Sequence, residues 1–131
     1  MAQPMTFRTF HPDGYAAPAA PYSAVVGSGE LIFVSGQVPL DPAGRVVDGG
    51  IAEHASQVHA NLVACLAAAG CSLADVVKTT VYLAQEEDFD TFNAVYASWF
   101  DDPLPARTAV RAGLMRGFLV EVDVIARVPE A

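Results

Sequence analysis

Residues 118–128 read FLVEVDVIARV, and this stretch decides how the chain folds. Side chains alternate between the two faces of a strand, so one face carries an unbroken apolar row made of Phe118, Val120, Val122, Val124, Ala126 and Val128. Helices must cover such a row. The opposite face holds Leu119, Glu121, Asp123, Ile125 and Arg127, a mixture that suits a subunit interface containing a site. The alternative is an exposed strand with two isolated aliphatic residues.

Outward from this strand, two hydrophobic periodicities divide the rest of the chain. Apolar residues spaced by three and four predict helices over 51–70 and 87–100, and β-branched runs predict strands over 23–26, 31–38, 76–83 and 108–114. A turn at 115–117 is expected to join the last two strands, and a type I turn at 41–44 to precede a short extension at 45–47. Four prolines predict an irregular arm over residues 1–21.

The predicted elements follow in the order ββαβαββ, which indicates an α+β domain with two helices on one face of a mixed sheet. The chain has 131 residues, enough for one self-sufficient core and too few for two, so a single domain over residues 1–131 is expected. Hydrophobic residues make up 53% and charged residues 17%. That composition excludes intrinsic disorder and favours an oligomer, whose interfaces hide apolar area.

Acidic residues outnumber basic ones by fifteen to seven, for a formal net charge of −8. This field repels phosphate backbones, so no nucleic-acid partner is expected. The longest uncharged run, 55–74, carries a polar helical face, which indicates no membrane span, and the first residues lack a secretory signal pattern. Cys65 and Cys71 are too few for a disulfide scaffold and are interpreted as free thiols. A cytoplasmic protein is therefore expected.

Three familiar kinds of site find no support in the sequence. His54 and His59 lie five residues apart on a predicted helix, about 140° around its axis, so they cannot share a metal ion. Ser35 lacks the G-x-S-x-G setting of a hydrolase nucleophile. Gly27 and Gly29 lead into a strand, whereas the glycines of a dinucleotide loop lead into a helix. No metal or nucleotide site is predicted.

Arg107, Glu121 and Asn93 are the polar residues that could carry chemistry. Arg107 enters a predicted strand just after Pro105, and a rigidly held guanidinium binds a carboxylate through two parallel hydrogen bonds. On composition alone, a structural ion pair is the commoner role for such an arginine, and Glu121 equally suits a surface or interface acid. Asn93 lies among apolar residues of a predicted helix, where its amide needs a buried partner.

Several short motifs follow one another in an order that identifies a family. They are Pro21-Tyr22-Ser23, residues 33–39 (FVSGQVP), Asn61-Leu62, Ala69-Gly70, residues 75–81 (DVVKTTV), Phe89 through Asn93 to Tyr96, Pro105-Ala106-Arg107-Thr108 and Val120-Glu121-Val122. The most specific pair is the Pro-Ala-Arg element and the hydrophobic-Glu-hydrophobic element that follows about fourteen residues later. From Pro21 onward, nearly the whole chain resembles the RidA/YjgF family of enamine/imine deaminases.

The resemblance implies a chorismate-mutase-like fold and a homotrimer, in which three sheets form a central barrel and a pocket lies between each pair of neighbouring subunits. By similarity, Arg107 holds the substrate carboxylate and Glu121 positions or activates the attacking water. Residues at matching positions are expected to line the pocket: Tyr22, Ser35, Gly36, Asn93 and Ala109. Many bacterial members have cysteine where this chain has Ala109, so we expect a wider pocket and an altered substrate preference.

The reaction that the resemblance implies is hydrolysis of a 2-imino acid, or its enamine tautomer, to a 2-oxo acid and ammonia, with no metal or organic cofactor. Two alternatives stay open. One is a specialised enzyme of the same fold acting on an aminoacrylate, an aminomuconate-like acid or a biosynthetic intermediate. The other is a non-catalytic module that binds a small metabolite, although the presence of both Arg107 and Glu121 favours catalysis. RNA cleavage, attributed to some relatives, conflicts with the net charge of −8.

Overall fold

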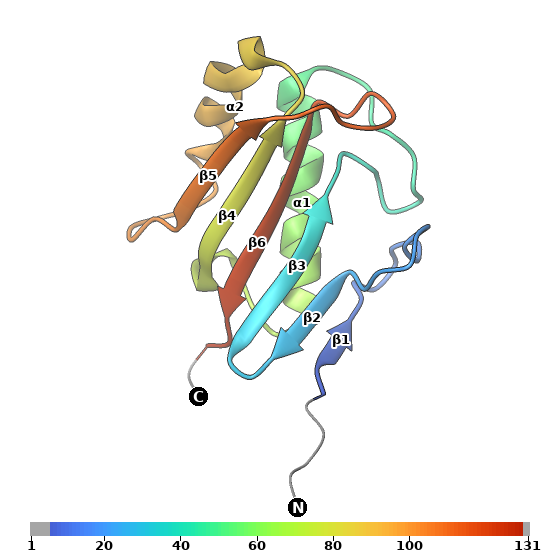
Figure 1. Cartoon of the computed structure of the whole chain (residues 1–131), viewed down its shortest axis with the longest axis vertical. Helices are drawn as coiled ribbons and strands as arrows, with labels where there is room; N and C mark the ends of the chain where they lie inside the picture. The colour runs from blue at the N-terminus through green and yellow to red at the C-terminus, as the bar shows by residue number, and fades with distance from the viewer. Residues whose placement is uncertain (1–5, 130–131) are drawn as a thin grey trace, which may run out of the picture.

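One mixed six-stranded sheet carries two helices on a single face (Figure 1). The computed structural model describes residues 6–129. Its strands are β1 (Arg8–Phe10), β2 (Val25–Ser28), β3 (Leu31–Gln37), β4 (Val76–Leu83), β5 (Ala106–Arg111) and β6 (Val120–Arg127). The helices are α1 (Ile51–Ala68) and α2 (Phe89–Tyr96), and short 3₁₀ helices, η1 (Leu73–Asp75) and η2 (Glu86–Asp88), precede β4 and α2. The predicted α+β class, with both helices on one face, is confirmed.

The strands lie in the order β1-β2-β3-β6-β4-β5. All neighbours are antiparallel except β4 and β5, which run parallel with Thr79 opposite Arg107. β4, α2 and β5 thus form a crossover unit, in which the helix returns the chain to the end of the sheet where β4 began. The predicted mixed sheet is confirmed, and its single parallel pair places β5 at an outer edge.

The apolar row of β6 forms the centre of the core. Val120, Val122 and Ala126 are fully buried and Val124 is nearly so. They pack in one cluster with the buried side of α1, which consists of Ile51, Ala55, Val58, Leu62, Cys65 and Leu66. The prediction from residues 118–128 is confirmed. Strict alternation puts these apolar side chains on one face of β6, and they are removed from water only where the helices cover that face.

Glycines flank helix α1 on both sides, with Gly50 before it and Gly70 after it. At its start, Glu53 Oε1 accepts a hydrogen bond from the backbone N–H of Gly50 at 2.8 Å. At its end, Gly70 adopts a φ of +75° and its N–H donates to the carbonyl of Ala67 at 3.0 Å, which confirms it as the predicted stop. Among residues 6–129, neither helix combines the length and the apolar character needed to cross a bilayer.

The C-terminal half differs from the sequence prediction at several boundaries. Helix α2 is shorter than the predicted 87–100, because Ser98 and Trp99 donate to carbonyls three residues back and tighten the chain beyond Tyr96. Strand β5 occupies Ala106–Arg111 rather than 108–114, and β6 begins at Val120 rather than 118. A turn does join them near 115–117, but the two strands are not neighbours. The crossover through α2 delivers β5 to the far side of β4.

The predicted N-terminal arm also contains a strand. Arg8–Phe10 forms β1, which pairs with the outer edge of β2 with Arg8 opposite Gly27. No proline lies between residues 5 and 11, so nothing in this stretch prevents the backbone from pairing with an open sheet edge. Residues 11–22 run without helix or strand, as predicted. Residues 1–5 of the predicted arm lie outside the described part of the chain.

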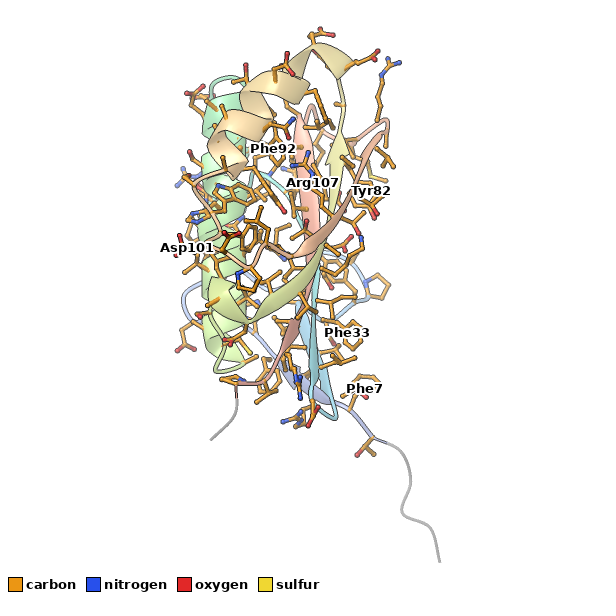
Figure 2. All side chains as sticks on the ribbon, turned by 90° about the vertical axis from the view of Figure 1, so that its left-hand side faces the viewer. Phe7, Phe33, Tyr82, Phe92, Asp101 and Arg107 are labelled. Carbon is orange, nitrogen blue, oxygen red and sulfur yellow. The ribbon has the colours of Figure 1, made fainter. Side chains whose placement is uncertain are left out.

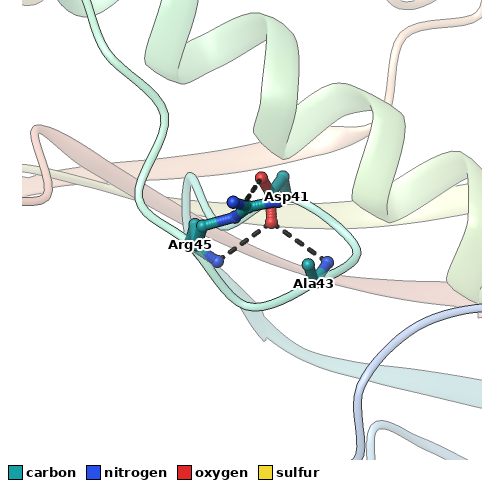
Figure 3. A network of polar contacts seen from close by, with 3 residues as sticks. All are labelled: Asp41, Ala43 and Arg45. Carbon is teal, nitrogen blue, oxygen red and sulfur yellow. Dashed lines mark hydrogen bonds and ion pairs between the residues drawn. The ribbon is translucent and has the colours of Figure 1, made fainter.

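Asp41 organises the turn that follows β3 (Figure 3). Its Oδ1 accepts hydrogen bonds from the backbone N–H groups of Ala43 at 3.0 Å and Arg45 at 2.9 Å, and its carbonyl accepts one from Gly44 at 2.8 Å. The last bond confirms the predicted turn at 41–44. From α1, Asn61 Nδ2 donates to the carbonyl of Leu40 at 2.9 Å. These bonds fix the loop that leads away from Gly36 and the end of β3.

Candidate active site

Glu121 lies on the sheet face that the helices leave uncovered. It occupies β6 opposite Tyr82 of β4, and its own neighbours Val120 and Val122 point into the core. Near the end of β3, Gly36 lies against its carboxylate: a β-carbon at position 36 would come within 2.9 Å of Glu121 Cδ and closer still to Oε2. A β-carbon at position 36 would therefore require the Glu121 carboxylate to move from this position.

A cavity of about 700 Å³ opens over Glu121. Three residues predicted to line a pocket, Tyr22, Ser35 and Gly36, lie in its wall. Ser35 Oγ donates to the carbonyl of Ser23 at 2.6 Å, and this bond holds the segment that carries Tyr22 against β3. The wall also contains residues that the sequence analysis did not single out for a site, namely His11, Tyr15, Asn61, Met115, Arg116 and Phe118.

The protonation of Glu121 is shifted by its surroundings. Burial raises the pKa of its carboxyl, and the nearby Asp123 carboxylate raises it further. Asp123 in turn accepts a hydrogen bond from Tyr82 Oη at 3.1 Å. This bond, together with burial and the two acids, raises the pKa of the Tyr82 phenol. A glutamate with a raised pKa is better suited to taking up and releasing a proton than an ordinary glutamate.

Arg107 is held in place between β5 and α2. Its Nη2 donates to Asn93 Oδ1 at 2.6 Å, which gives the Asn93 amide the partner that its place in the helix required. Three rings surround the guanidinium, with centroids 4.6 Å from its Cζ for Tyr96, 5.6 Å for Phe92 and 5.9 Å for Phe89. We call these three rings and Asn93 the cradle of Arg107. The rings recur along one side of the helix, and this aromatic spacing is the feature of the sequence that could have predicted the cradle. No acidic side chain of residues 6–129 forms an ion pair with Arg107.

Ala109 belongs to the Arg107 part of the site. It lies two residues further along β5 and so shares a face with Arg107. It lines a second cavity of about 470 Å³, together with Phe89, Asp90 and Arg111. The predicted pocket residues therefore fall into two groups within one chain. Asn93, Arg107 and Ala109 form the first group, and Tyr22, Ser35, Gly36 and Glu121 form the second.

The two groups lie on opposite faces of the sheet. Arg107 pairs with Thr79, whose hydroxyl lies 2.8 Å from Tyr96 Oη of α2, so both residues face the helices. Glu121 pairs with Tyr82 on the other face. Figure 2 shows Arg107 between the sheet and α2, with Tyr82 and Phe33 directed away from the helices. Within one chain, the guanidinium of Arg107 and the carboxylate of Glu121 cannot reach one small ligand.

The histidines and cysteines have structural surroundings. His54 is buried and its Nδ1 accepts a hydrogen bond from the backbone N–H of Leu119 at 3.2 Å. The His59 ring lies against Trp99 with centroids 5.2 Å apart. Burial raises the pKa of the Cys65 thiol to about 11. Across residues 6–129, no three His, Cys, Asp or Glu side chains gather into a group that could hold a metal ion.

Comparisons with known proteins agree with the fold and the motifs. The family model described as Endoribonuclease L-PSP matches residues 14–128. The mouse 2-iminobutanoate/2-iminopropanoate deaminase is 50% identical over 114 residues, covering 84% of each chain, and a RutC family protein of Pyrococcus horikoshii is 44% identical over 111 residues, covering 83% of this chain and 88% of that one.

Solved structures of similar proteins superpose over nearly the whole chain. RidA from an Antarctic Psychrobacter gives a TM-score of 0.86 at 36% identity, covering 92% of this chain and 98% of that one. Escherichia coli TdcF, solved with bound serine, gives a TM-score of 0.85 at 30% identity with the same coverage. The residues matched by the family model, 14–128, include both groups of candidate site residues. The chain therefore belongs to the RidA/YjgF family, to which the Endoribonuclease L-PSP family model corresponds.

Proposed function

We propose that this protein hydrolyses 2-imino acids, or their enamine tautomers, to 2-oxo acids and ammonia. The observation that carries the proposal is the cradle of Arg107. Asn93 uses one of the five guanidinium donors, so a fork of donors stays available for a substrate carboxylate. The mouse and human relatives named 2-iminobutanoate/2-iminopropanoate deaminase, at 50% and 44% identity, support this substrate class.

The proposed chemistry needs one anchor and one proton-transfer group. Water adds to C2 of the iminium form of the substrate, so that a C–O bond forms, and the C–N bond then breaks. The nitrogen leaves as ammonium with the protons of the water, and C2 becomes a carbonyl. We assign the proton transfers to Glu121, whose raised pKa suits both uptake and release. Such help is worth about 10² to 10⁴ in rate, and the proposed reaction uses no cofactor.

A homotrimer is part of the proposal. Because Arg107 and Glu121 lie on opposite faces of one sheet, they meet at one substrate only when they come from different copies. The uncovered face also exposes Leu31, Phe33 and Val110 by 39% to 42%, an apolar area that a neighbouring copy would cover. A cyclic trimer with a central barrel of three sheets would place Arg107 of one copy beside Glu121 of the next.

The description of the family model raises RNA cleavage as a second candidate. The net charge of −8 opposes it, because binding a phosphate backbone depends on clustered basic residues. We therefore propose a small-molecule carboxylate as the substrate, with neither a nucleic acid nor a membrane as partner. The specialised enzyme of the same fold and the non-catalytic binding module remain the alternatives.

Two free, buried thiols, Cys65 and Cys71, support a cytoplasmic location.

A coupled assay tests the function directly. An amino-acid oxidase generates a 2-imino acid in the cuvette, and the lifetime of that imino acid is followed with and without added protein. A shortened lifetime with release of a 2-oxo acid is expected, and an unchanged lifetime in the presence of tight 2-oxo acid binding would identify the binding module.

Light scattering tests the oligomeric state and is expected to give a mass of three times 13.8 kDa. A stable monomer would remove the intersubunit site.

A further inference from the structure

Arg116 is an unexpected residue in the turn between β5 and β6. Its φ is +55° and that of Gly117 is +73°, and the backbone N–H of Phe118 donates to the carbonyl of Met115 at 3.0 Å. Two consecutive positive φ angles closed by this bond define a type I′ turn. Asparagine, aspartate and glycine are favoured at its central positions, since a longer side chain is strained there. Strain of this kind is frequent in ligand-binding loops.

The turn presents Arg116 to the cavity over Glu121. Arg116, Tyr22 and Glu121 all line that cavity, and its wall contains no other arginine or lysine. The guanidinium lies over the ring of Phe118, with its Cζ 5.6 Å from the centroid. Phe118 is itself buried and lies two residues before β6. The ring thus supports the Arg116 side chain without using its hydrogen-bond donors for a protein acceptor.

The donors of Arg116 are available to a ligand. Within residues 6–129, Arg111 and Arg116 form no ion pair and no side-chain hydrogen bond, whereas acids or hydrogen-bond acceptors engage the other five basic residues. Of these two, Arg116 lines the cavity over Glu121, and Arg111 lines the second cavity. Asp41, an acid in the same cavity wall, is already occupied by the backbone N–H groups of Ala43 and Arg45. In a chain of net charge −8, an unengaged guanidinium facing a cavity favours an anionic group there.

We propose that Arg116 binds a second carboxylate of the substrate, so that this site prefers dicarboxylic 2-imino acids. The inference rests on the proposed function. Arg107 of a neighbouring copy holds the C1 carboxylate, Glu121 serves C2, and Arg116 takes the carboxylate at the far end of the chain. In the reaction, a C–O bond forms and the C–N bond breaks at C2, so a dicarboxylic 2-oxo acid and ammonium leave and the far carboxylate stays unchanged.

Two substrates of equal chain length isolate the second carboxylate. Amino-acid oxidases produce 2-iminoglutarate from glutamate and 2-iminopentanoate from norvaline, and these differ only in the terminal group. Arg116→Gln and Arg116→Asn remove the guanidinium, and asparagine also suits the turn. Arg8→Gln is the control because it removes the same charge from a residue that lines neither cavity. For both Arg116 variants we expect KM for 2-iminoglutarate to rise about tenfold or more, as for a lost charge-assisted bond.

The same experiment defines what overturns the inference. We expect KM for 2-iminopentanoate to stay within about twofold in both Arg116 variants, and both KM values to stay unchanged in Arg8→Gln. An equal rise in KM for both substrates would mean that Arg116 contacts the C1 carboxylate or supports folding. An unchanged KM for both would mean that Arg116 is a surface residue without a role in binding. Calorimetric binding of 2-oxoglutarate and 2-oxopentanoate gives a second readout. If wild-type protein hydrolyses neither imino acid, the proposed function fails, and the binding data still decide the role of Arg116.

Discussion

Arg107 faces helix α2 and Glu121 faces the uncovered side of the same sheet, although only β4 separates their strands. Pairing across the sheet fixes this relationship, since Arg107 lies opposite Thr79 and Glu121 lies opposite Tyr82. Changes of rotamer cannot bring the two charges together, because the backbone of the sheet lies between the two faces. Within one copy the two proposed site residues are therefore apart, and the proposed chemistry depends on assembly.

Replacing Arg107 by lysine is expected to lower kcat/KM for a 2-imino acid by about two orders of magnitude. Lysine keeps the charge but loses the planar fork, the bond to Asn93 and the stacking on Tyr96, so the substrate carboxylate is misplaced. Steady-state kinetics in the coupled assay measures the loss, with Arg8→Lys as the control. Near-normal turnover would reduce Arg107 to a structural residue of the β5–α2 contact.

Replacing Glu121 by glutamine is expected to lower kcat by about 10² to 10⁴ while changing the affinity for a 2-oxo acid little. Glutamine keeps the shape against Gly36 but cannot accept a proton. Because the Glu121 pKa is raised, wild-type kcat/KM is expected to fall with decreasing pH through a value above that of an ordinary glutamate. Kinetics and calorimetry over a pH series measure both effects. An unchanged kcat would assign the proton transfer to water or to another group.

Mixing the two defective chains tests the intersubunit site. Arg107→Ala and Glu121→Gln are each expected to be inactive alone, yet their co-expression is expected to restore about a quarter of wild-type activity. Random assembly makes about three quarters of trimers mixed, and each mixed cyclic trimer regains one intact site of three. Activity per trimer of the purified co-expressed protein gives the answer. No recovery in correctly mixed trimers would place both residues in sites within single chains.

Gly36→Ala is expected to abolish most activity while changing the melting temperature little. A methyl group at this position would meet the Glu121 carboxylate, which has to move out of its place over β6. The matched control is Gly113→Ala, because Gly113 has open space around its α-carbon and no positive φ. Thermal unfolding and turnover are measured for both variants. If Gly36→Ala behaves like Gly113→Ala, the close approach of Gly36 to Glu121 is not required.

Alkylation with iodoacetamide at neutral pH is expected to leave the folded protein active. Cys65 lines the cavity, but burial raises its pKa to about 11, so almost no reactive thiolate is present. Burial, assisted by Asp75, also raises the pKa of Cys71. Mass spectrometry of folded and denatured samples shows which thiols react, and turnover is measured in parallel. Loss of activity on modification of folded protein would require a nucleophilic mechanism.

The amino-acid sequence alone specifies the local parts of this protein. The alternation in FLVEVDVIARV predicts the buried row of β6, and Gly70 predicts the end of α1, because both depend on geometry within a few residues. The motifs around Arg107 and Glu121 predict the family by resemblance. In each case the information lies in neighbouring side chains and needs no knowledge of where distant segments meet.

The tertiary structure decides the relations between distant segments. Parallel pairing of β4 with β5 depends on the path of the crossover through α2, and the pairing of β1 depends on the free edge of β2. The separation of Arg107 from Glu121 follows from strand register, where a shift of one residue would reverse the face of every side chain. Likewise, only the fold turns Arg116 of a short loop towards the cavity over Glu121. Such placements arise from long-range packing and hydrogen bonding, which no local pattern of residues contains.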